Sequence, residues 1–218
     1  MPSRKIKPLY SKENIEDLDN NIFFKLICGA STTDTVVIRD LSYLYALAGA
    51  NMIDISSDEA SIKAAKDGIS LAKKQYEETP DKYGYYKKPI LMVSINASDD
   101  PHFKTANIDE NICQNCGLCI YECSFVAISR CTETRRSIIN KKLCYGCGKC
   151  VSVCPSRAIN LCNNDVDLDY VLTKLIDDSV AGIEIHTGSS SFENLQAFWN
   201  RVTSLLGEDR IKRMLISF

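Results

Sequence analysis

The chain has 218 residues, of which 45% are hydrophobic and 25% charged, and its formal net charge is -2. This composition is typical of a globular protein large enough for one substantial core, and the near-neutral charge argues against nucleic acid as the main partner. No apolar run reaches the roughly 18 residues of a membrane-spanning helix, so no transmembrane segment is expected. Eleven cysteines without an apolar signal-peptide core at the start predict a reducing, cytoplasmic location.

Four regions follow one another along the chain. Residues 1–21 are polar and charged, and they predict a flexible N-terminal segment that ends in a short helix. Residues 22–106 are expected to form the first part of a βα domain. Residues 107–165 form a cysteine-rich insert, and residues 166–218 continue the βα domain.

Apolar runs alternate with stretches of helical periodicity outside the insert. The predicted strands are 22–28, 51–55, 89–96, 181–185 and 211–218, and the predicted helices are 36–49, 57–78, 167–179 and 191–206. This alternation requires a parallel sheet covered by helices through right-handed crossovers, and therefore an α/β fold. Five strands are too few for a closed eight-stranded barrel. The sheet is expected either to be open or, as we favour, to form the first part of a TIM-barrel-like domain.

The cysteines of the insert form an internal repeat with a period of 31 residues. Both copies have the spacing C-x2-C-x2-C-x3-C, which is typical of bacterial ferredoxins with two clusters. In those proteins the fourth cysteine of each set ligates the other cluster. We therefore predict two [4Fe-4S] clusters. The first is assigned to Cys113, Cys116, Cys119 and Cys154, and the second to Cys144, Cys147, Cys150 and Cys123.

Zinc and disulfides are the alternatives to iron-sulfur clusters. Structural zinc more often uses two separated C-x2-C pairs or includes histidine, and disulfides need an oxidising compartment. Gly117 and Gly148 each follow the second cysteine of a set, where the backbone must approach a cluster closely. Ser124 departs from the ferredoxin pattern, because the second copy has Pro155 at that position.

Several stretches taken together resemble the light-dependent-period proteins (LdpA) of cyanobacteria. They are Phe24–Ser31, Tyr45–Ala50, Asp100–Phe103, Cys144–Gly148 and Glu184–Thr187. The resemblance implies a metal-binding iron-sulfur protein that senses cellular redox state and passes it to the circadian clock by binding clock components or redox donors. It also implies a longer chain, because family members extend past the position that corresponds to Phe218.

Polar residues occupy one face of the predicted strands. Side chains alternate along a strand, and this parity places Lys25, Asp54, Glu184 and His186 on the face away from the helices. These four residues are our candidates for a small-molecule site at the carboxyl ends of the strands. The alternative is a self-neutralising interior, in which Lys25 pairs with Asp54 or Glu184 because an unpaired buried charge costs several kcal/mol.

Three functions from different classes are compatible with the sequence. The leading one is a redox-responsive regulator that transmits the state of its clusters to a protein partner. The second is an iron-sulfur oxidoreductase with chemistry at the strand ends, and the third is a plain electron-transfer protein. Arg135 and Arg136, on the connector between the two cysteine sets, are candidates for tuning the clusters or for contacting a partner.

Overall fold

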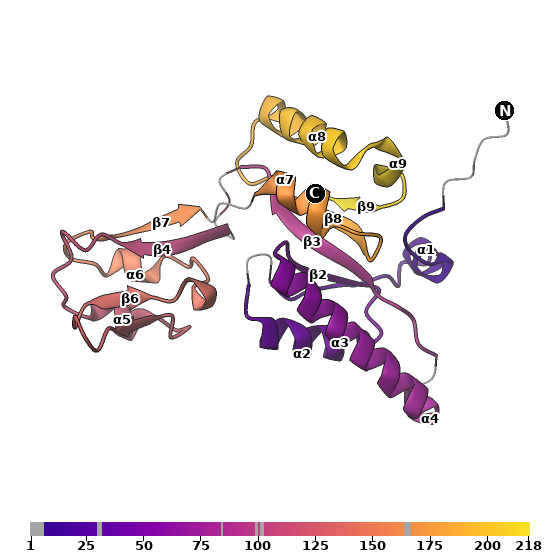
Figure 1. Cartoon of the computed structure of the whole chain (residues 1–218), viewed down its shortest axis with the longest axis horizontal. Coiled ribbons are helices and arrows are strands. Elements are labelled where there is room, and N and C mark those ends of the chain that lie inside the picture. Colours follow the sequence, from indigo (N-terminus) through magenta and orange to yellow (C-terminus); the bar gives the residue numbers. More distant parts are fainter. Residues whose placement is uncertain (1–6, 30–31, 84, 99, 101–102, 164–166) are drawn as a thin grey trace. The chain divides into compact units, whose positions relative to one another are not determined.

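The computed structural model describes residues 7–29, 32–83, 85–98, 100, 103–163 and 167–218 (Figure 1). It divides into two compact units, Met1–Ser98 with Val166–Phe218, and Asp99–Asp165. We call them the sheet unit and the cysteine-rich unit. The predicted insert lies inside the second unit, which begins at Asp99 and not at Asn107. Two of the stretches on which the family resemblance rests are described only in part, because residues 30–31 and 101–102 lie outside the described residues.

The sheet unit contains five parallel strands that lie side by side in chain order. They are β1 (Lys25–Ile27), β2 (Met52–Ser56), β3 (Ile90–Asn96), β8 (Val180–His186) and β9 (Leu215–Ser217). This parallel sheet confirms the α/β class. Among the described strands β1 and β9 form the two edges, so the sheet is open and the TIM-barrel-like alternative is not confirmed.

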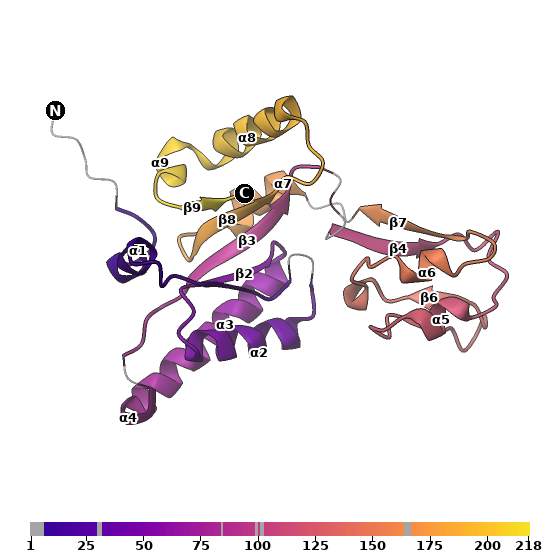
Figure 2. The same ribbon diagram turned by 180° about the vertical axis from the view of Figure 1, so that it is seen from behind.

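Helices α2 (Thr35–Leu47) and α3 (Glu59–Glu78) lie side by side against the sheet (Figures 1 and 2). Both begin at an aspartate whose carboxylate accepts hydrogen bonds from free backbone amides of the first turn, Asp34 for α2 and Asp58 for α3. The short helix α4 (Pro80–Tyr83) follows α3 directly. None of the helices built by the described residues combines the length and the apolar character that crossing a membrane requires.

The second half of the sheet unit departs from the predicted boundaries. The helix predicted for 167–179 ends earlier, as α7 (Leu168–Tyr170) and one π-helical turn, η3 (Val171–Leu175). Asp177 explains this, because its carboxylate accepts hydrogen bonds from the backbone amide and hydroxyl of Ser179 and so holds a turn there. Helix α8 (Phe192–Leu206) is followed by α9 (Glu208–Ile211), which ends on the first residue of the predicted last strand, and that strand begins only at Leu215.

The two faces of the sheet bury different residues. The main core lies between the sheet and the helices, with Ile53, Val93 and Ile183 fully buried against Ile38 and Val202. The opposite face carries a smaller apolar cluster of Met52, Ile90, Met92 and Ala181. Leu9, Tyr10 and Phe23 pack against this second cluster.

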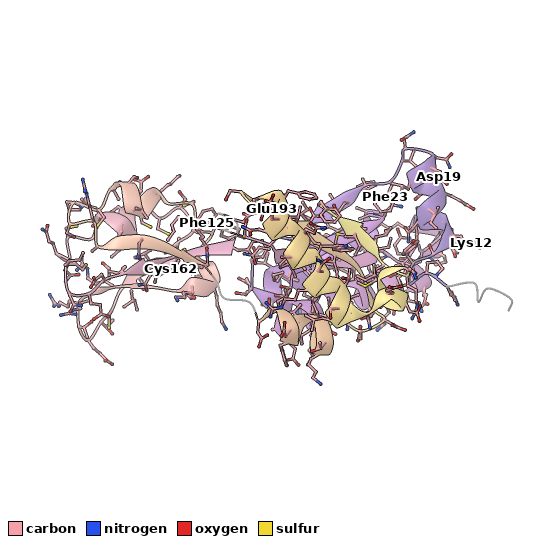
Figure 3. All side chains as sticks on the ribbon, turned by 90° about the horizontal axis from the view of Figure 1, so that it is seen from above. Lys12, Asp19, Phe23, Phe125, Cys162 and Glu193 are labelled. Carbon is pink, nitrogen blue, oxygen red and sulfur yellow. The ribbon has the colours of Figure 1, made fainter. Side chains whose placement is uncertain are left out.

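Helix α1 (Lys12–Asp19) lies in the N-terminal segment, for which a short helix was expected at the end. Lys12 and Asp19 mark its two ends in Figure 3. The buried side chain of Asn51 donates a hydrogen bond to Asp17 of this helix. The described part of the N-terminal segment is therefore tied to the sheet.

The cysteine-rich unit is built from two similar halves. One two-stranded antiparallel sheet pairs β4 (Lys104–Ile108) with β7 (Ile159–Asn163), and the other pairs β5 (Ile128–Arg130) with β6 (Ser137–Ile139). The short helices of this unit are α5 (Leu118–Glu122), the 3-10 turn η2 (Lys141–Leu143) and α6 (Lys149–Ser152).

The 31-residue period also holds for backbone conformation. Gly117 and Gly148 precede α5 and α6 and have φ of 81° and 76°. Residues with a side chain rarely adopt such values. Val126 and Arg157, another pair of equivalent positions, both have φ of 53°. The sequence repeat is therefore a structural repeat.

Candidate metal centre

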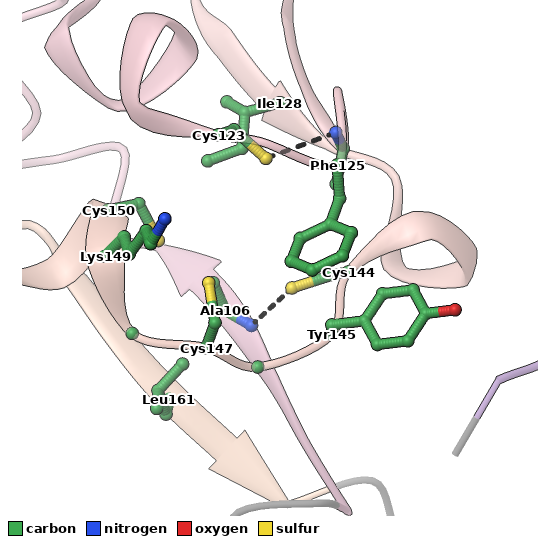
Figure 4. A pocket seen from close by; sticks show the side chains of 13 residues that line it. Ala106, Cys123, Phe125, Ile128, Cys144, Tyr145, Cys147, Lys149, Cys150 and Leu161 are labelled. Atoms are coloured by element: carbon green, nitrogen blue, oxygen red, sulfur yellow. Dashed lines mark hydrogen bonds between the residues drawn. The ribbon is translucent and has the colours of Figure 1, made fainter. Parts of the chain in front are cut away.

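The eight repeat cysteines line two hollows in the cysteine-rich unit. The first hollow is lined by Cys113, Cys116, Cys119 and Cys154. The second hollow is lined by Cys123, Cys144, Cys147 and Cys150, whose side chains surround a common space in Figure 4. In each hollow the fourth cysteine comes from the other repeat. This grouping is the same as the crossed ligand sets that the spacing predicted.

Backbone amides donate hydrogen bonds to the cysteine sulfurs. The amide nitrogens of Ala127 and Ala158, at equivalent positions, lie 3.3 Å from Cys123 Sγ and 3.2 Å from Cys154 Sγ. The amide of Ala106 lies 3.3 Å from Cys144 Sγ (Figure 4). Such donors stabilise the negative charge of a thiolate, which is the form that binds metal.

The arrangement fits a cluster better than a single ion. Among the residues that the structure describes, no group of three or more His, Cys, Asp or Glu side chains is arranged to hold one metal ion. A zinc ion with Zn–S bonds of about 2.3 Å would need four sulfurs drawn tightly around one point. Four soft sulfur donors that are not drawn around one point suit a compact iron-sulfur core.

All eleven cysteines are free thiols in the structure, so the disulfide alternative finds no support. Burial raises the pKa of Cys119 and Cys150, the latter to about 11, so these thiols release a proton when they bind a metal. Burial also raises the pKa of Cys28 to about 11, and its sulfur lies 3.9 Å from Ser42 Oγ in the main core. Cys28 therefore acts as a small buried side chain.

The structure brings together the four candidate residues of the sheet. Lys25 Nζ lies 2.5 Å from Glu184 Oε2 and 3.4 Å from Asp54 Oδ2, so both pairs that the sequence allowed are formed. Ser94 donates its hydroxyl hydrogen to Asp54 Oδ1 at 2.8 Å, and His186 Nε2 lies 3.4 Å from the same hydroxyl. One polar network therefore crosses β1, β2, β3 and β8.

Burial and pairing act in opposite directions on the two carboxylates of this network. Burial raises the pKa of Asp54, which is 1% exposed, and the nearby Lys25 only partly offsets this effect. Burial also acts on Glu184, but hydrogen bonds from Lys25 and Ser217 outweigh it and hold its pKa below the ordinary value. The fold therefore favours the charged form of Glu184 and disfavours that of Asp54.

Two residues near the first hollow were not singled out from the sequence. Ser137 lines that hollow, and the Arg130 guanidinium lies against Gly117, where an added Cβ would be 2.6 Å from Nη2. Arg136, which was singled out, forms an exposed ion pair with Glu110 at 2.8 Å, so its charge is offset. An alignment of the two repeats places Ser137 opposite Ala106. Ser137 could therefore have been found from the sequence, as a position where the two repeats differ.

The fold and the hollows thus define an α/β protein with a ferredoxin-type iron-sulfur unit. The family model of the 4Fe-4S binding domain matches residues 137–160, a range that contains all four cysteines of the second repeat. The chain is also 38% identical, over 99 residues, to Light dependent period A of Synechococcus elongatus. That match covers 45% of this chain and 26% of the relative, so it spans about a quarter of the relative's length.

Proposed function

We propose that this chain is an iron-sulfur redox protein that binds two [4Fe-4S] clusters and passes cellular redox state to the circadian clock through protein partners. The observation that carries the proposal is the pair of hollows, each lined by four cysteines in the crossed pattern. The 4Fe-4S model covers only the second repeat. The first hollow supports the second cluster, because its backbone and its cysteines repeat those of the other.

The residues of the unit have defined tasks when clusters are bound. A [4Fe-4S] cluster supplies reversible transfer of one electron. The cysteines hold it as thiolates, and the amides of Ala106, Ala127 and Ala158 offset the negative charge on their sulfurs. Gly117 and Gly148 let the loops turn in the left-handed conformation beside the second cysteine of each set.

The circadian role and the partners rest on the similarity to Light dependent period A, whose name describes a light-dependent period. A protein that reports a redox state needs a surface that a partner recognises and a cluster that changes within the range of cellular potentials. We propose clock components or redox donors as those partners. We also propose a reducing compartment such as the cytoplasm, because eight of the eleven cysteines are needed as thiolates.

A second candidate is an oxidoreductase with a small-molecule site on the inner face of the sheet. The network of Lys25, Asp54, Glu184 and His186 favours it, because these groups converge from four strands. The charges of Lys25 and Glu184 are already paired with each other, however, and this favours the structural role. The chain order of the five parallel strands also supports a barrel-like continuation of the sheet, which we retain as a proposal.

The test is anaerobic purification followed by analysis of metal and partners. We expect about eight irons and eight acid-labile sulfides per chain, as two cubanes require. Pull-down with the reduced and the oxidised protein from a cyanobacterial lysate should then recover different clock or electron-transfer proteins. A content of about two zincs without sulfide would reject the clusters. The same proteins recovered with both forms would reject redox signalling, and a bound flavin or metabolite would favour the oxidoreductase.

A further inference from the structure

The two hollows differ in polarity at equivalent positions of the repeat. The first hollow is lined by Ser137, Ser156 and Gln114, where the second has Ala106, Phe125 and Tyr145. Hydroxyl and amide groups therefore face the first site, and a methyl group and two aromatic rings face the second. The backbone and the cysteines are alike, so this difference lies in the side chains.

Phe125 and Tyr145 cover the second hollow. Their rings are stacked, with centroids 4.4 Å apart and an interplanar angle of 20° (Figure 4). At the position equivalent to Ser137, Ala106 has no side chain that could donate a hydrogen bond. The second hollow therefore offers backbone amides to its sulfurs but no hydroxyl at this position.

Ser137 begins β6 and is 5% exposed. Within the described part of the chain its hydroxyl oxygen is buried and has no hydrogen-bond partner. Ser137 and Cys119 both line the first hollow. A buried hydroxyl without a partner costs about 1–3 kcal/mol, so an acceptor in the first hollow would explain why serine is used here.

Ser156 provides a second hydroxyl at the first site. Its Oγ lies 3.7 Å from Cys154 Sγ, and it can donate to that sulfur once the cysteine is a thiolate. At the equivalent position of the other repeat stands Phe125, which offers only an apolar ring to Cys123. The first hollow is thus lined by two hydroxyl groups, those of Ser137 and Ser156.

Fixed positive charge is found beside both hollows. Arg130 lies against Gly117 beside the first hollow, and it donates to the Asn115 side chain at 3.0 Å. Lys149 lines the second hollow, with Nζ 3.3 Å from Ser124 Oγ. The hydroxyl groups of Ser137 and Ser156 therefore remain as a difference between the sites.

We propose that Ser137, supported by Ser156, donates a hydroxyl hydrogen bond to sulfur at the first site, so that this site has the higher reduction potential and is reduced first. The inference rests on the proposed two-cluster function. Hydrogen bonds to sulfur stabilise the negative charge that reduction adds, and so do less apolar surroundings. Both therefore raise the reduction potential of an iron-sulfur site. Reduction adds one electron from a one-electron donor, which is oxidised, and no bond is formed or broken.

The consequence is a response in two steps. Mild reduction would change only the site of Cys113, Cys116, Cys119 and Cys154, and the site covered by Phe125 and Tyr145 would follow under stronger reduction. A protein that senses redox state would then distinguish three states: fully oxidised, half reduced and fully reduced.

The experiment is an anaerobic redox titration of the full chain with dithionite, followed by electron paramagnetic resonance. The unmodified protein should show two separate one-electron steps. Ser137→Ala should move only the higher step to a more negative potential, and Ser156→Ala should move it further. Ala106→Ser is the matched reverse change, because it gives the second site the hydroxyl that the first site has. It should raise only the lower step and so bring the two steps together.

The outcomes separate the inference from the function on which it depends. About eight irons with both steps unmoved in Ser137→Ala and in Ala106→Ser would overturn the inference and leave the two-cluster function intact. About four irons in the unmodified protein would overturn both. If Ser137→Ala loses iron, Ala106→Ser decides, and an unmoved lower step in that variant rejects the role of the hydroxyl.

Discussion

Cys123 and Cys154 occupy equivalent positions in the two repeats, yet each lines the hollow of the other repeat's first three cysteines. Each hollow therefore draws its four sulfurs from both halves of the cysteine-rich unit. Because neither set of ligands is complete within one half, loading one site constrains the fold around the other. Each cluster is therefore expected to tie the two halves of the unit to each other.

The crossed arrangement predicts which cysteines belong together. Cys154→Ser should leave about four irons, with the same electron paramagnetic resonance spectrum as Cys113→Ser, because both residues line the first hollow. Cys123→Ser and Cys144→Ser should share the other spectrum, since both line the second. If Cys154→Ser instead matches Cys144→Ser, each repeat binds its own cluster and the crossed assignment is wrong.

Metal removal should affect the two units differently. Among the described residues of the cysteine-rich unit, the hydrophobic core cluster contains five buried residues, and two of them are the ligands Cys119 and Cys150. Such a small core depends on its metal. Chelation of iron under oxidising conditions should abolish the amide protection of β4 and β7 in hydrogen exchange.

The sheet unit should survive the same treatment, because its core is separate and much larger. The single tryptophan, Trp199, lies on α8 and packs against that core, so its fluorescence reports on this unit alone. We expect no change in the denaturant midpoint of this signal after chelation. A parallel loss of the tryptophan transition would show that the sheet depends on the clusters.

Glu184→Gln should destabilise the sheet unit in a pH-dependent manner. The pKa of Glu184 is held below its ordinary value of 4.5, so the charged form stabilises the folded state above that pH. The benefit is lost as the pH falls through the folded-state pKa. We expect a loss of about 1–3 kcal/mol in the free energy of unfolding at pH 7, because Lys25 keeps only Asp54 as a partner.

Asp54→Asn is the matched control for that measurement. Burial holds the pKa of Asp54 above its ordinary 3.8, so its charged form costs stability as the pH rises through the folded-state pKa. The variant should therefore lose less stability at pH 7 than Glu184→Gln, as followed by Trp199 fluorescence in urea. A smaller loss for Glu184→Gln than for Asp54→Asn would contradict this order. A lost redox response at unchanged stability would instead support a functional site.

Gly68→Ala should destabilise the packing of α2 against α3. Gly68 faces α2, where an added Cβ would overlap the carbonyl oxygen of Arg39 and lie 3.1 Å from Ser42 Cβ. Backbone cannot move aside as a long side chain can, so the two helices must separate. We expect a loss of about 1–3 kcal/mol. Ser70→Ala is the control, because Ser70 is exposed on the same helix and should have little effect in thermal unfolding.

Local chemistry made the cysteine sets predictable. A spacing of two or three residues places thiols around one small object, whatever the fold of the rest of the chain. The period of 31 residues repeats this spacing in the second half of the insert. Strand parity likewise placed Lys25, Asp54, Glu184 and His186 on one face of the sheet, because side chains alternate along any strand. These features depend on neighbours in the sequence.

Other features required the tertiary structure, because they depend on residues far apart in the chain. Lys25 and Glu184 are 159 positions apart, and only the order of the strands decides that Lys25 reaches Glu184 as well as Asp54. The end of η3 depends on the turn that Asp177 makes with Ser179. Ser137 is one of many serines in the sequence, and only packing buries its hydroxyl at the first hollow, where neither strand of its sheet provides a partner.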